Sequence, residues 1–100
     1  MKNLSENIKL KNPEIQIETI SIDFTQFTKN KENEELFYQD LDKKLEKLEI
    51  GILVNNVGIN YSGPLYHHEA SIELDNQIVS VNINTLNRFT KIFLSNLLKK

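Results

Sequence analysis

The stretch that decides the predicted fold is Ile50-Gly-Ile-Leu-Val-Asn-Asn-Val-Gly58. Its short unbroken run of apolar, mostly branched residues, Ile52 to Val54, is typical of a strand that is buried on both faces, as in a parallel sheet. The run stops at Asn55, Asn56 and Gly58, residue types that form local hydrogen bonds and adopt unusual backbone angles. Since ligands of open α/β sheets bind beyond the carboxyl ends of the strands, this polar strand end is the first candidate site.

The rest of the chain supplies four further elements around this strand. Hydrophobic periodicity predicts three helices, over residues 2–11, 34–48 and 74–98. Alternating isoleucines predict a second strand over residues 15–24, with a phase shift at Glu18-Thr19. The order helix, strand, helix, strand, helix predicts an α/β fold with a parallel sheet and right-handed crossovers. The polar residues 25–34 and the Gly-, Pro- and His-containing residues 59–71 predict loops.

Composition excludes several classes of function. The chain has 100 residues, 39% of them hydrophobic and 26% charged, which is ordinary for a soluble protein. A net charge of -2 without a basic stripe argues against nucleic acid or an anionic membrane as partner. No apolar run approaches the length of a membrane span, about 18 residues. The chain has no cysteine, and the neighbouring His67 and His68 lack a carboxylate at a usual ligand spacing, so no metal site is predicted.

The predicted sheet is too small to be stable alone. An isolated pair of strands is marginal in water, and helical propensity does not compensate, because most helix stability in proteins comes from tertiary packing. We therefore expect residues 1–100 to be an incomplete domain, taken from the middle of a larger α/β domain.

Three segments together resemble landmarks of the short-chain dehydrogenase/reductase family. Ile52-Leu-Val-Asn-Asn-Val-Gly58 resembles its Asn-Asn-x-Gly motif, Ile22-Asp-Phe24 resembles the segment beside the adenine, and Val81-Asn-Ile-Asn84 resembles the segment with the catalytic asparagine. Within the family the chain looks most like the very-long-chain 3-oxoacyl-CoA reductases and the related 17-beta-hydroxysteroid dehydrogenases. This resemblance implies a partial Rossmann-like, doubly wound parallel sheet.

The resemblance also implies two parts that these 100 residues lack. Family members seat the cofactor pyrophosphate on a glycine-rich turn at a helix N-terminus, and the chain has no such turn. They also use a Tyr-x-x-x-Lys pair, in which the tyrosine donates a proton and the lysine lowers its pKa. None of the three tyrosines has a lysine four residues later. We therefore expect the chain alone to be catalytically inactive.

The resemblance assigns the cofactor-binding residues. Asn55, Asn56, Val57 and Gly58 would line the ribose and nicotinamide side of an NADP cleft, and Asp23 would accept a hydrogen bond from the adenine amine. A second interpretation is that the asparagines and Gly58 are ordinary turn residues, although the other landmarks favour the cofactor. For Asp23, capping of the following loop or helix is an equally open alternative.

Asn82 is the candidate catalytic residue. Leu86, Phe89 and Phe93 form a helical stripe, and continuing it backwards by four residues leads to Asn82. An amide on an apolar stripe is costly unless it is hydrogen-bonded. By resemblance, Asn82 holds a water in a proton relay and kinks the helix; the alternative is an ordinary helix asparagine at the polar end of the stripe.

The resemblance implies an NADP-dependent oxidoreductase of lipid or steroid metabolism, which reduces 3-oxoacyl-CoA or steroid carbonyls at the endoplasmic reticulum, or otherwise in the cytoplasm. Three hypotheses stay open for this chain. It is a truncated enzyme whose missing parts restore activity, or a non-catalytic remnant that binds a partner such as an intact paralogue in a homo- or hetero-oligomer, or a degenerate product that does not fold.

Overall fold

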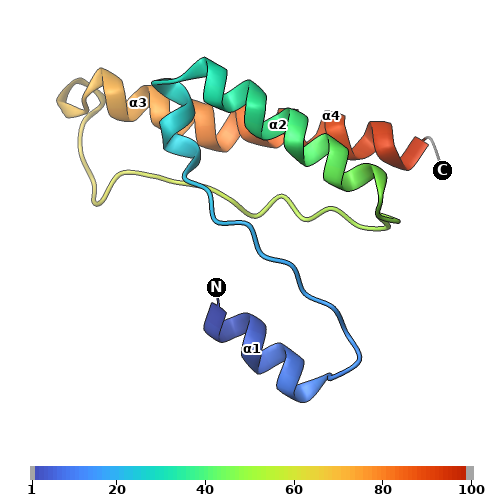
Figure 1. The fold of residues 1–100 in the computed structure, drawn as a ribbon. Coiled ribbons are helices and arrows are strands. Elements are labelled where there is room, and N and C mark those ends of the chain that lie inside the picture. The colour runs from blue at the N-terminus through green and yellow to red at the C-terminus, as the bar shows by residue number, and fades with distance from the viewer. Residues whose placement is uncertain (1, 99–100) are drawn as a thin grey trace.

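The computed structural model describes residues 2–98, with side chains described from Leu4 onwards. Its elements are α1 (Lys2–Lys11), the 3-10 helix η1 (Phe24–Thr28), α2 (Lys31–Glu46), the 3-10 turn η2 (His67–Glu69), α3 (Ile72–Val79), the π-helical turn η3 (Ser80–Asn84) and α4 (Thr85–Leu98). Helices α3, η3 and α4 follow one another without a break, α2 packs beside them, and α1 stands apart at the end of an extended stretch (Figure 1).

The predicted α/β fold with a Rossmann-like, doubly wound parallel sheet is wrong, because residues 2–98 contain no β-strand. The two predicted strands, residues 15–24 and 50–58, lie in stretches without regular structure, apart from Phe24, which begins η1. Among the described residues, positions 16–22 take part in no backbone hydrogen bond. A helix forms its hydrogen bonds within its own segment, whereas a strand needs a neighbouring strand. The helices therefore form here, and the strand patterns yield only extended chain (Figure 1).

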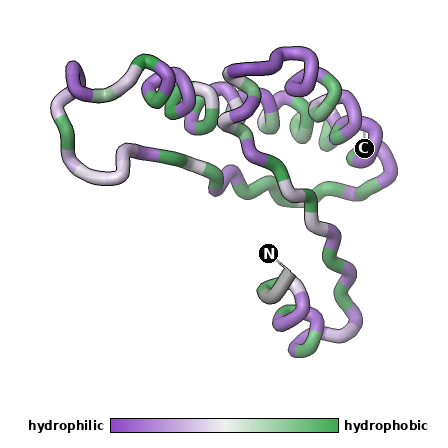
Figure 2. The backbone as a smooth tube through the Cα atoms, turned by 60° about the vertical axis from the view of Figure 1, so that its left-hand side comes forward, coloured by the Kyte–Doolittle hydropathy of each residue, from purple (hydrophilic) through white to green (hydrophobic). Residues whose placement is uncertain are grey.

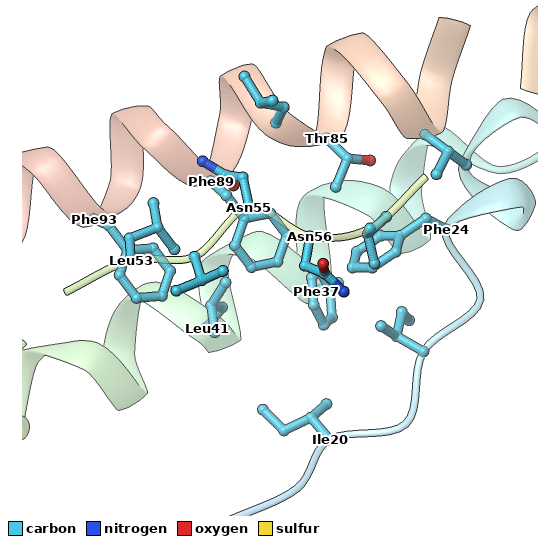
Figure 3. Close-up of a pocket in the computed structure, with 15 residues that line it drawn as sticks. Ile20, Phe24, Phe37, Leu41, Leu53, Asn55, Asn56, Thr85, Phe89 and Phe93 are labelled. Carbon is cyan, nitrogen blue, oxygen red and sulfur yellow. The ribbon is translucent and has the colours of Figure 1, made fainter. Parts of the chain in front are cut away.

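The expected burial of Ile52 to Val54 on both faces is also wrong. Ile52 is 83% exposed and Val54 is 75% exposed. Leu53 between them is half-buried and lies near Leu41 of α2 and Phe93 of α4 (Figure 3). The helices thus cover one face of this segment only, and its apolar residues alternate between helices and solvent.

The three predicted helices are present, with shifted boundaries. α1 has the predicted bounds. α2 begins three residues early because the Asn30 side chain caps it, accepting a hydrogen bond from the Asn33 amide at 3.1 Å. α3 begins at Ile72 because Ser71 Oγ accepts a hydrogen bond from the Leu74 amide at 3.1 Å. Both caps are visible in the sequence as polar residues just before a helical pattern.

An aromatic cluster forms the centre of the fold. All five phenylalanines and Tyr38 belong to it, with neighbouring ring centroids 5.2–6.3 Å apart. Phe24 of η1 contacts Phe37 of α2 at 5.9 Å and Phe89 of α4 at 5.7 Å, both edge to face. Such pairs each add about 0.5–1.5 kcal/mol beyond the area that they bury. Aromatic packing, with Leu41 and Leu45 buried beside it, therefore joins η1, α2 and α4.

Polar contacts fix α4 against α2. Both terminal nitrogens of Arg88 donate to the Glu35 carboxylate at 2.9 Å, and the Arg88 guanidinium carbon lies 4.6 Å from the centre of the Tyr38 ring. The buried Asn96 amide donates to Asp42 Oδ1 at 3.1 Å and to the Ile92 carbonyl at 3.0 Å. Within the described residues, no buried side-chain nitrogen or oxygen is left without a hydrogen bond.

The ion pair of Glu35 predicts how stability depends on pH. Hydrogen bonds from Arg88 lower the pKa of the Glu35 carboxyl below its ordinary value. A carboxyl whose pKa is lower in the folded chain stabilises the fold above the unfolded value, about 4.3, and the stabilisation is lost as the pH falls through the folded pKa. We expect the urea unfolding midpoint of Glu35→Gln to decrease less than that of the wild type when the pH is lowered through the acid range. Glu49→Gln is the control, since Glu49 forms no ion pair with a described residue. An equal slope in both variants would contradict the prediction.

Candidate functional site

Two adjoining hollows lie between the extended residues 53–59 and the helices. The larger has a volume of about 290 Å³ and is lined mostly by apolar side chains, which come from α2, α4 and the extended segments between the helices, with Asn55, Asn56 and Thr85 as its polar residues (Figure 3). The smaller, about 170 Å³, is lined by Asp23, Gly58 and their neighbours. The two hollows share four lining residues: Ile22, Phe24, Val57 and Val81.

The structure brings the predicted cofactor-binding residues to these hollows. Asn55, Asn56 and Val57 line the larger one, while Asp23, Val57 and Gly58 line the smaller one. Segments more than 30 residues apart in the sequence therefore meet at one site, and the ligand roles of these residues stay predictions.

Gly58 needs no special backbone angle. No glycine or other described residue has a positive φ. A Cβ at Gly58 would lie 3.5 Å from Asn82 Oδ1, an ordinary contact distance. The expected unusual backbone angle is therefore absent, and the relevant feature of Gly58 is its closeness to the Asn82 amide.

Asn82 joins the extended segment to the long helix. Its Oδ1 accepts from the Ile59 amide and its Nδ2 donates to the Ile59 carbonyl, both at 2.8 Å. A side-chain amide thus pairs with a backbone peptide residue as a neighbouring strand would. Asn82 lines neither hollow, but Ile59 lines the smaller one. The predicted relay role of Asn82 stays a prediction, and its contact with Ile59 was not foreseen.

The helix departs from α geometry around Asn82. In η3 the Thr85 amide donates to the carbonyl of Ser80, five residues back, and Thr85 Oγ1 donates to the same carbonyl at 3.1 Å. Single π turns of this kind are frequent at functional sites. Sequence reasoning did not find Thr85, because a threonine five residues after a serine is not a recognisable pattern.

Asp23 caps η1. Its carboxylate accepts from the Thr25 amide at 3.0 Å, from Thr25 Oγ1 at 2.6 Å and from Gln26 Nε2 at 3.4 Å. These hydrogen bonds, those of Thr25 above all, lower the pKa of Asp23. The capping interpretation therefore describes the geometry, and an adenine contact stays a prediction.

Comparison with known proteins finds very-long-chain 3-oxoacyl-CoA reductases among the relatives of this chain. Very-long-chain 3-oxoacyl-CoA reductase-A of Danio rerio is 37% identical over 82 residues, which cover 80% of this chain and 23% of that protein. The very-long-chain 3-oxoacyl-CoA reductase of Rattus norvegicus is 32% identical over 103 aligned positions, which cover 100% of this chain and 30% of that protein. The chain is similar in sequence to a segment of the very-long-chain 3-oxoacyl-CoA reductases. The predicted resemblance is therefore confirmed.

The reductase relatives are much longer than this chain. The chain spans about a quarter of the length of these relatives, 23% and 30% of the two described above. A third relative, the very-long-chain 3-oxoacyl-CoA reductase of Coprinopsis cinerea, is 34% identical over 85 residues and is covered to 23%. None of these three names mentions a steroid, so the steroid substrate stays a prediction. No protein-family model and no solved structure matches the chain.

The pKa values of Tyr38 and Tyr61 are both raised, so neither hydroxyl gives up its proton readily. Burial raises the pKa of Tyr38, which is 2% exposed. Tyr61 donates its hydroxyl proton to Asp75 Oδ1 at 2.7 Å, and this hydrogen bond raises the pKa of Tyr61.

The described residues contain no group of three His, Asp or Glu side chains that could hold a metal ion. No helix in the described part of the chain is long and apolar enough to cross a membrane.

Proposed function

We propose that residues 1–100 carry part of the nicotinamide-nucleotide cleft of a reductase that acts on a 3-oxoacyl-CoA or another lipid-like carbonyl. The supporting observation is that Asp23 and the Asn55–Gly58 segment line two adjoining hollows. The names of the relatives suggest the substrate class and the reduction. NADP as the preferred nucleotide, and the endoplasmic reticulum as the compartment, are expectations from the resemblance alone.

The described residues fit only the neutral ends of such a nucleotide. The amides of Asn55 and Asn56 offer both donors and acceptors, as ribose hydroxyls and a carboxamide require. The pyrophosphate needs free backbone amides and positive charge. The helix start nearest the smaller hollow is that of η1, where the carboxylate of Asp23 already accepts the Thr25 amide and would repel an anion. The described residues around the two hollows therefore provide part of the cleft, and the start of η1 does not provide a pyrophosphate seat.

We infer that the chain alone does not catalyse reduction. A bound nicotinamide nucleotide supplies the hydride, and the protein must orient the carbonyl and protonate its oxygen. The pKa values of Tyr38 and Tyr61 are shifted upwards, away from the proton donor that this step needs. This chain therefore contributes binding and orientation. Asn56 binds the nucleotide, and Asn82 orients the site by holding the Ile59 backbone.

A titration with NADPH tests this proposal. Asn56 is exposed and forms no hydrogen bond with a described residue, so its amide is available to a ligand. We expect weak binding, with a dissociation constant of about 1 mM, or roughly 4 kcal/mol. Chemical-shift changes should concentrate at residues 23–25 and 55–59, without NADPH oxidation when a 3-oxoacyl-CoA is added.

Matched variants sharpen the titration. Asn56→Ala should weaken NADPH binding at least threefold, whereas Asn7→Ala on the distant helix α1 should leave it unchanged. Shift changes centred outside the two hollows would contradict the proposed cleft. Turnover at rates typical of enzymes, about 1 per second or more, would contradict the inferred inactivity.

A second candidate function is binding to a partner chain, such as an intact relative, without catalysis. The chain exposes 8224 Å². A compact monomer of 11.7 kDa would expose about 5,900 Å². The difference exceeds the roughly 800 Å² per partner of a standard interface. This candidate expects a tagged chain to retain a full-length relative in a pull-down without NADPH, and a stable, inert monomer would count against it.

A further inference from the structure

Asn55 in the larger hollow is hydrogen-bonded to a side chain of the neighbouring helix α4. Asn55 follows the apolar run of residues 52–54, and its Nδ2 donates to Thr90 Oγ1 of α4 at 3.2 Å. The Thr90 hydroxyl in turn donates to the carbonyl oxygen of Leu86, one helical turn earlier, at 2.8 Å. Three groups on two elements thus form one chain of hydrogen bonds.

The hydrogen bonds in this chain run in one direction, from Asn55 through Thr90 to the Leu86 carbonyl. A hydroxyl has a single proton, and a backbone carbonyl can only accept. Since the Thr90 proton is used at the Leu86 carbonyl, Thr90 Oγ1 can only accept a proton from Asn55. A flipped Asn55 amide would keep this contact only if the Thr90 hydroxyl left the Leu86 carbonyl and donated to Asn55 Oδ1 instead. The nitrogen of Asn55 is therefore directed to α4, and its Oδ1 is left without a hydrogen bond from any described residue.

We propose that Thr90 is a positioning residue, which holds the Asn55 amide so that Oδ1 is presented to a ligand. The larger hollow then selects a ligand that offers a hydrogen-bond donor at this point, such as the NH₂ of a carboxamide or a ribose hydroxyl. The identity of the ligand rests on the proposed function, whereas the orientation of Asn55 does not. The neighbouring Asn56 has no such restraint from a described residue, so selection depends on Asn55.

The free protein tests the orientation of Asn55. Thr90→Val keeps the shape of the side chain and removes the hydroxyl, and Thr90→Ser keeps the hydroxyl. In NMR spectra of the side-chain NH₂ groups, we expect the Asn55 resonances of the valine variant to move towards those of an asparagine side chain that has no hydrogen bond to the protein. The serine variant should keep the wild-type positions. Identical Asn55 resonances in all three proteins would overturn the positioning role.

Two small neutral probes test the selection. Nicotinamide offers a carboxamide NH₂, and methyl nicotinate has the same ring with acceptors only. We expect the wild type and Thr90→Ser to bind nicotinamide at least threefold more tightly than methyl nicotinate. Thr90→Val should lose this preference, with an unchanged urea unfolding midpoint.

The outcomes separate this inference from the proposed function. Equal binding of both probes by the wild type would overturn the selection, and so would a preference that persists in Thr90→Val. A preference for nicotinamide that depends on Thr90, in a chain that shows no shift changes with NADPH, would support the positioning role and contradict the nucleotide cleft.

Discussion

Replacing Phe27 with alanine is expected to lower the free energy of unfolding by about 3–5 kcal/mol, the usual cost of removing a buried phenylalanine. Phe27 is 4% exposed. Its ring lies 5.7 Å from that of Phe24, 5.6 Å from that of Phe37 and 5.8 Å from that of Tyr38. The substitution therefore removes the buried area, one aromatic contact within η1 and two aromatic contacts that attach η1 to α2.

Urea unfolding, followed by the near-ultraviolet circular dichroism of the aromatic side chains, measures this effect. Leu36→Ala is the control, because Leu36 lies on α2 and is 63% exposed, so its removal should change stability by about 0.5 kcal/mol or less. If the alanine variant is unfolded at the start, Phe27→Leu provides an intermediate loss of volume and a measurable transition. Equal midpoints for Phe27→Ala and the wild type would show that the aromatic cluster is not the core.

Asn82→Leu is expected to have the next largest effect, a loss of about 2–4 kcal/mol. The leucine has a similar volume but cannot pair with the Ile59 amide and carbonyl, which Asn82 contacts at 2.8 Å each. Each backbone group that loses its partner in a half-buried position costs about 1–3 kcal/mol. Since the chain between Leu53 and Ile59 has no strand neighbour among the described residues, the loss should release this segment from the helix.

Hydrogen exchange at the Ile59 amide reports this release directly. We expect protection of this amide to fall at least tenfold in Asn82→Leu, while the α2 amides change only by the global loss of stability. Asn84→Leu is the matched control, since Asn84 lies in the same π turn but is exposed. Unchanged exchange at Ile59 in Asn82→Leu would contradict the prediction that Asn82 holds this segment against the helix.

The site could be anticipated in part from the sequence. The resemblance selected Asp23, the Asn55–Gly58 segment and Asn82, and the structure places them at or beside two adjoining hollows. Thr90 was not found, because its contact with Asn55 spans 35 residues and leaves no local pattern. The same holds for the Ile59 backbone, whose partner Asn82 lies 23 residues away.

Local hydrogen bonding explains which parts of the fold the sequence determined by itself. The helices follow from apolar spacing, and α1 has the predicted bounds, because helical hydrogen bonds join residues close in the chain. The caps Asn30 and Ser71, though local, lengthened α2 and α3 at their starts. The alternation between α1 and η1, where Figure 2 shows hydrophobic and hydrophilic positions in turn, predicted a strand that residues 2–98 do not form.

Only the tertiary structure decided whether the two extended segments became strands. Their backbone groups need partners on another segment, and residues 2–98 provide no neighbouring strand. The second segment instead contacts the long helix through Asn82, which pairs with the Ile59 backbone, and Thr90, which accepts from the Asn55 side chain. Tertiary packing also decided that the aromatic rings of η1, α2 and α4 form the core, because contacts between distant side chains are set by how the helices meet and not by their spacing in one segment.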